Sequence, residues 1–152
     1  MRKKLFPLII IFFFVASCEE KREDEIILTG SIVVEGNISS ELTFLKVSSV
    51  LGQDYIEASN QEILKFQPSF PICNLVISTT IAGNTYAAIV YQKDGNSAIT
   101  YIVKDPKYNY QKDSKVFQIE KTILSKEINW KTHEVDPSIS VTIYGSLKVN
   151  QQ

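Results

Sequence analysis

Three runs of strand-forming residues stand out in the middle of the chain, at 75–81, 86–92 and 98–103. They are rich in β-branched and aromatic residues, and short turn sequences separate them. The turn at Asp94-Gly95 is the strongest hairpin cue, because both central positions of a type I′ turn need a positive φ. The pattern therefore predicts a three-stranded antiparallel meander.

Shorter strand patterns flank this meander. On its N-terminal side the expected strands cover residues 26–34, 42–47, 55–58 and 63–66. A turn is expected at 52–54, and Pro68 and Pro71 exclude a central strand between them because proline donates no backbone hydrogen bond. On the C-terminal side, residues 136–138 predict a turn before a last strand in which apolar residues alternate over 139–143.

The stretch at 116–130 fits two patterns. Phe117 and Ile119 alternate as they would in a strand. Phe117, Leu124 and Ile128 also fit a helical stripe, so a helix stays open. We favour the strand interpretation.

The strand patterns indicate an all-β domain. Eight or so short strands between residues 26 and 152 predict a single antiparallel β-sandwich with immunoglobulin-like or related topology. A small β-barrel is the alternative. The length of the segment suits one domain with its own hydrophobic core.

The N-terminus has a different pattern. Arg2, Lys3 and Lys4 precede an apolar run at 5–15. As a helix this run would be about 16 Å long, against about 30 Å for the hydrocarbon core of a bilayer. A basic segment followed by an apolar run of this length is typical of a secretion signal peptide, which we expect at residues 1–17.

The residues that follow, Val15-Ala16-Ser17-Cys18, resemble the lipobox of bacterial lipoprotein precursors. The resemblance covers residues 1–18, and Val15 stands where leucine is commoner. It implies that diacylglycerol is attached to the Cys18 sulfur, that a peptidase cuts before Cys18, and that the new amine is usually acylated. Each buried methylene contributes about 0.8 kcal/mol, so two or three chains anchor a protein stably.

Residues 18–25 are expected to form the lipidated cysteine and an acidic tether. The segment from 19 to 25 reads EEKREDE and is too polar to bury apolar surface. The resemblance implies a lipid-anchored protein of the cell envelope, and we expect the outer membrane, with the domain facing the periplasm or the surface.

The charge of the segment from 26 to 152 is nearly balanced. It holds 11 Lys and Arg and 12 Asp and Glu, which argues against a nucleic-acid partner.

Residue types that carry metal or acid–base chemistry are sparse. His133 is the sole histidine of the sequence, and it lies beside Glu134 and Asp136. Zinc sites use several His or Cys ligands, so we interpret this cluster as a solvated turn. No G-x-S-x-G elbow and no phosphate loop is present. We therefore expect no catalytic residue, no metal site, no cofactor and no enzymatic activity; an envelope hydrolase with a carboxylate-based site is the alternative.

Two single residues have predicted positions. With Cys18 lipidated, Cys73 has no partner for an intrachain disulfide. Its apolar neighbours predict that it is a small buried hydrophobe. Trp130, the one tryptophan of the sequence, is also expected in the core rather than at a binding surface.

One stretch, at 105–115, suits binding. It is the longest polar stretch between expected strands, and loops of β-scaffolds commonly carry binding residues. Tyr108 and Tyr110 are two residues apart and so face the same side of an extended segment. With Lys107 and Lys112 at the edges, they are the predicted binding residues. The domain is then a binding or scaffolding module for an envelope protein or a surface glycan.

Overall fold

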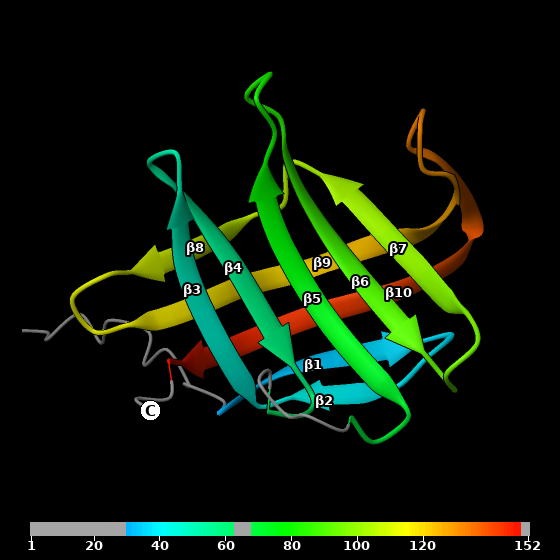
Figure 1. The fold of residues 1–152 in the computed structure, drawn as a ribbon, viewed down its shortest axis with the longest axis horizontal. Coiled ribbons are helices and arrows are strands. Elements are labelled where there is room, and N and C mark those ends of the chain that lie inside the picture. Colours follow the sequence, from blue (N-terminus) through cyan, green and yellow to red (C-terminus); the bar gives the residue numbers. More distant parts are fainter. Residues whose placement is uncertain (1–29, 63–67, 150–152) are drawn as a thin grey trace, which may run out of the picture.

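The computed structural model describes residues 30–62 and 68–149 of the 152-residue chain. The expected signal peptide, Cys18, the acidic tether and the strand expected at 63–66 lie outside the described residues. Within them the chain forms strands and no helix, so the all-β prediction is confirmed. The strands are β1 Ser31–Gly36, β2 Ser40–Leu42, β3 Phe44–Val50, β4 Gln53–Ser59, β5 Ile72–Thr79, β6 Thr85–Gln92, β7 Ala98–Lys104, β8 Tyr108–Gln111, β9 Val116–Asn129 and β10 Glu134–Lys148 (Figure 1).

All ten strands belong to one antiparallel sheet. Its order is β2-β1-β10-β9-β7-β6-β5-β4-β3, with β8 paired to β9 beside this path. The sheet curls back on itself, so that β3 to β7 lie across β8, β9, β10, β1 and β2 (Figure 1). The two halves pack like the layers of a β-sandwich, and because they remain one sheet the fold is also close to a small barrel.

A corner at Thr43 carries the chain from one layer to the other. The sequence predicted one strand over 42–47, whereas Leu42 ends β2 and Phe44 begins β3. The backbone amide of Thr43 donates to the carbonyl of Ser59 at the end of β4, 2.9 Å away. This long-range hydrogen bond, which no local pattern reveals, fixes the break between the two strands.

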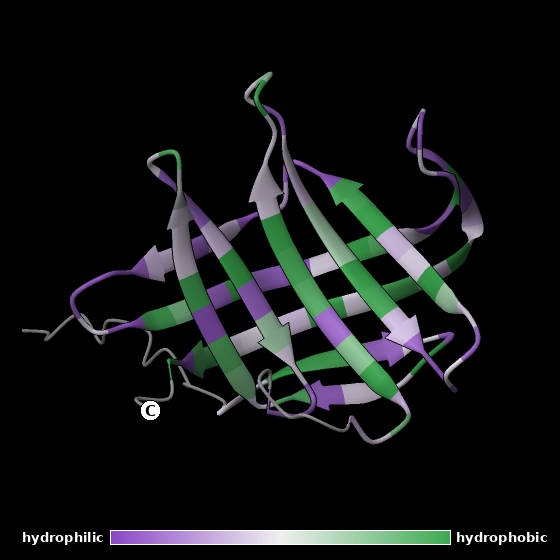
Figure 2. Cartoon of the chain, viewed as in Figure 1, coloured by the Kyte–Doolittle hydropathy of each residue, from purple (hydrophilic) through white to green (hydrophobic). Residues whose placement is uncertain are grey.

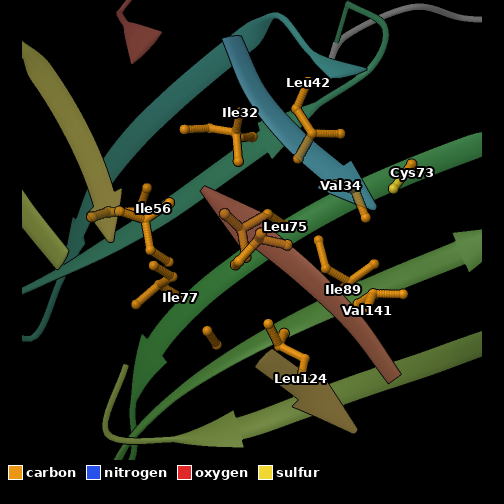
Figure 3. Packing of buried hydrophobic residues seen from close by; sticks show 14 of the residues in the cluster. Ile32, Val34, Leu42, Ile56, Cys73, Leu75, Ile77, Ile89, Leu124 and Val141 are labelled. Atoms are coloured by element: carbon orange, nitrogen blue, oxygen red, sulfur yellow. The ribbon is translucent and has the colours of Figure 1, made fainter. Parts of the chain in front are cut away.

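The core lies between the two layers. Strand β5 shows the alternation that builds it: Cys73, Leu75 and Ile77 are fully buried, and the residues between them are partly exposed. Successive side chains of a strand point to opposite faces, so apolar and polar residues alternate along several strands in Figure 2. Figure 3 shows side chains of both layers meeting in this core, among them Ile32, Val34, Leu42, Ile56, Ile89, Leu124 and Val141.

The predicted meander is confirmed. Strands β5, β6 and β7 pair without a register shift, from Ile72↔Gln92 to Thr79↔Thr85 and from Tyr86↔Lys104 to Gln92↔Ala98. The strand interpretation of 116–130 is also confirmed, because β9 is a 14-residue strand. On one side β9 pairs with β8 and then β7, and on the other it pairs with β10.

Two predicted turns were wrong in position. The first turn lies at Leu51-Gly52, where φ is 51° and 79°, and Gln53 already belongs to β4. Residues 136–138 lie inside β10, where the register against β9 shifts between Asp136 and Ser140. A proline that cannot donate to the ladder is accommodated at such a bulge, so the strand continues through it.

Candidate binding surface

The predicted binding loop at 105–115 contains a short strand that the sequence did not indicate. Strand β8 pairs with the first part of β9, from Tyr108↔Ile119 to Gln111↔Val116. Four residues carry too little alternation to be recognised as a strand. Pairing with β9 is what makes this segment a strand, and the sequence alone does not show that pairing.

Tyr108 and Tyr110 do share one side of the segment, as their spacing predicts, but that side faces the core. Both are partly buried and pack against the hydrophobic cluster. The centroid of the Tyr108 ring lies 6.0 Å from that of Phe117, with a 45° tilt between the rings. Part of each tyrosine therefore stabilises the sheet, and only the remainder is open to a ligand.

An open depression of about 420 Å³ lies beside β8. It brings together Lys107 and Tyr108 of the predicted set, and its lining does not include Tyr110 or Lys112. Its lining residues are Pro106, Lys107, Tyr108, Asn109, Gln118 and Glu120. The other four were not among the predicted residues. The pairing Asn109↔Gln118 between β8 and β9 is what brings Gln118 and Glu120 beside this segment.

Lys112 lies elsewhere. Its Nζ is 3.3 Å from the Oδ2 of Asp54 at the start of β4. The lysine side chain is 73% exposed, so this ion pair contributes less than about 1 kcal/mol to stability. It does link the β8–β9 turn to the β3–β4 hairpin.

A second depression, of about 610 Å³, lies between the β3–β4 and β5–β6 hairpins. Leu51 and Ile81, at the two hairpin tips, are among its lining residues and are 93% and 102% exposed. Tyr55 lines it too; burial, and then the charge of Glu57, raise the pKa of its phenol, which stays neutral. The sequence placed the first turn at 52–54 and Ile81 at the end of an expected strand, so it did not identify this depression.

The core position predicted for Trp130 was wrong. The side chain is 72% exposed, because β9 ends at Asn129 and the chain turns at Trp130. The Nζ of Lys131 lies 5.5 Å from the centroid of its ring. The turn therefore presents an aromatic ring and a cation at its surface.

His133 lies in the same β9–β10 turn as Trp130, and a turn was predicted at this histidine. Its ring contacts Glu127 and Tyr86. Its Nδ1 is 2.8 Å from the Oε1 of Glu127, and its ring centroid is 4.8 Å from that of Tyr86 on β6. Asp136 accepts hydrogen bonds from Ser138, which lower its pKa. Within residues 30–62 and 68–149, no group of three or more His, Cys, Asp or Glu residues could hold a metal ion.

Cys73 is fully buried, which confirms its predicted position. Burial raises the pKa of its thiol to about 11, against a smaller opposite effect of a hydrogen bond with Ser40. We expect a maleimide to label Cys73 slowly in the native protein and rapidly after unfolding.

The raised pKa of Cys73 also predicts a pH effect. The unfolded thiol loses its proton from about pH 9 and the folded thiol from about pH 11, so the native state gradually loses stability over this interval. Denaturation followed by circular dichroism should show this loss, and Cys73→Ala should lack it. Rapid labelling of the native protein, or an identical pH profile for Cys73→Ala, would contradict the burial of the thiol.

Comparison with known proteins gives no relative: no family model, no curated protein and no solved structure matches this chain. Among the described residues, no helix is long and apolar enough to cross a membrane.

Proposed function

We propose that the mature protein is a non-enzymatic binding module of the cell envelope, anchored through lipid on Cys18. The anchor is supported by the basic start, the short apolar run and the Val15-Ala16-Ser17-Cys18 sequence. The acidic residues at 19–25 provide a polar spacer between lipid and domain.

The depression beside β8 is the proposed contact surface. The main support for this proposal is that Lys107 and Tyr108 line the same open depression as Asn109, Gln118 and Glu120. Ammonium and amide groups donate hydrogen bonds, and carboxylate and amide oxygens accept them. A tyrosine ring adds an apolar surface with a polar end. This combination suits the hydroxyl groups and apolar faces of sugars, so we take a surface glycan as the partner in preference to an envelope protein.

The alternative, an envelope hydrolase, has less support. Glycoside hydrolysis uses two carboxyl groups about 5–9.5 Å apart. Glu120 is the one carboxylate among the lining residues of the depression. Binding is therefore the function that the geometry favours.

The test is a double substitution, Lys107→Ala with Asn109→Ala. Both side chains are exposed, so the melting temperature should stay unchanged. Affinity for the recognised glycan, measured on an array of envelope polysaccharides, should fall about tenfold or more, equivalent to about 1.4 kcal/mol.

Gln111→Ala with Lys112→Ala is the matched control. These residues are exposed in the same segment and outside the depression, so binding should be retained. Equal binding by both double variants would place the contact surface elsewhere. Capture of an envelope protein that depends on Lys107 and Asn109, without glycan binding, would identify the partner as protein.

A further inference from the structure

Three hairpin tips at one end of the sheet carry exposed apolar side chains: Leu51 between β3 and β4, Ile81 between β5 and β6, and Trp130 between β9 and β10. The three turns project toward the upper edge of Figure 1. Contacts agree with this view. Leu51 and Ile81 line the same depression, and His133, from the turn of Trp130, packs on Tyr86 near the start of β6.

Two of the three tips, β3–β4 and β5–β6, differ in chemistry from other turns of the same sheet. The β3–β4 turn is Leu51-Gly52 and the β5–β6 turn contains Ile81-Ala82-Gly83, all without charge, and both tips are green in Figure 2. The β6–β7 turn reads KDGNS and the β8–β9 turn reads KDSK. Turns are normally polar because they face water, so two neighbouring tips that each expose a large apolar side chain beside one depression are a candidate contact surface.

We propose that these three tips insert into the surface of the lipid bilayer to which Cys18 anchors the protein. This inference rests on the proposed anchor, which holds the domain beside a membrane. The apolar residues stand on separate turns and not on one continuous face, which suits a deformable lipid interface better than a packed protein interface. Trp130 and Lys131 strengthen the assignment, because tryptophan concentrates at membrane interfaces and lysine extends its ammonium to the headgroups.

The length of the tether permits this orientation. Ser31 begins β1 at the lower edge of Figure 1, away from the tips. The residues from 19 to 30 span at most about 40–43 Å when extended. An eight-residue strand such as β5 is about 26 Å long. The tether can therefore pass along the domain and leave the tips in contact with the bilayer.

The single tryptophan of the chain makes a direct test possible, because all tryptophan fluorescence comes from one tip. The mature protein, purified from membranes, is reconstituted into vesicles of phosphatidylethanolamine and phosphatidylglycerol with brominated acyl chains, and vesicle flotation measures its anchoring. We expect the Trp130 emission to shift to the blue and to lose about half of its intensity or more by contact with lipid. Leu51→Ser with Ile81→Ser should reduce this quenching and leave flotation unchanged.

The matched control moves the reporter to the other end of the sheet. Trp130→Phe with Ser97→Trp places the tryptophan in the β6–β7 turn, where emission should remain that of an aqueous residue. Floated protein whose Trp130 emission equals that of this control would overturn the proposal and leave the anchor intact. Protein that does not float would overturn both the anchor and the proposal. A blue shift that follows protein concentration without vesicles would assign the tips to contacts between copies of the chain, and would also overturn it.

Discussion

Replacing Cys18 by alanine is expected to move the protein from the membrane fraction to the soluble fraction. The substitution removes the sulfur that would carry diacylglycerol, and with it acyl chains that contribute about 0.8 kcal/mol for each buried methylene. Acyl labelling should disappear at the same time. The measurement is fractionation of cells after metabolic labelling with a fatty acid.

Cys73→Ala is the matched control, because it removes the other cysteine of the sequence from a fully buried position. This variant should remain labelled and membrane-bound. The anchor would be refuted by a Cys18→Ala protein that loses its signal peptide and still sediments with membranes after a high-salt wash. Release of the Cys73→Ala variant would refute the choice of cysteine.

Replacing Phe117 by alanine is expected to lower the free energy of unfolding by about 3–5 kcal/mol. Phe117 is fully buried, and its ring lies against Tyr108, so the cavity opens under β8 as well as in the core. A domain is commonly stable by about 5–15 kcal/mol, so the variant should be close to unfolding. Urea denaturation followed by circular dichroism measures the loss.

Ile123→Ala is the control for Phe117. It lies on the same strand, β9, and its side chain is 62% exposed. Its removal should cost less than about 1 kcal/mol. Similar losses for the two variants would contradict the register of β9 against β10, whose shift between Ile119 and Thr122 is what puts Phe117 in the core and Ile123 at the surface.

The parts of the fold that the sequence predicted depend on neighbours along the chain. The β5–β6–β7 meander follows from runs rich in β-branched and aromatic residues and from a glycine turn after Asp94. The burial of Cys73 was predicted from its apolar neighbours along the chain. Strand β9 was ambiguous, because Phe117 and Ile119 fit a strand while the apolar residues at 117, 124 and 128 fit a helix, and only the pairing with β10 decides between them.

The parts that it missed depend on contacts between distant segments. Strand β8 exists because β9 offers an edge to pair with, and the break at Thr43 depends on a hydrogen bond to Ser59. Trp130 was expected in the core because large aromatic residues are mostly buried. Trp130 is exposed because β9 ends at Asn129, and the sequence pattern did not predict that end of the strand.

The candidate binding surface was also predicted only in part. The sequence identified the segment that carries Lys107 and Tyr108, which do line the depression. It placed Tyr110 and Lys112 beside them, although Tyr110 packs on the core and Lys112 pairs with Asp54. The spacing of the tyrosines predicted their common side correctly, but the direction of that side is set by the opposite layer of the sheet.

The most direct test of the lipid-anchored module is the mass of the N-terminal peptide from the mature protein, isolated from membranes. We expect a chain that begins at Cys18 and carries diacylglycerol on its sulfur, with or without a further acyl group on the amine. A mature chain that begins at another residue, or a peptide with an unmodified Cys18 thiol, would contradict it.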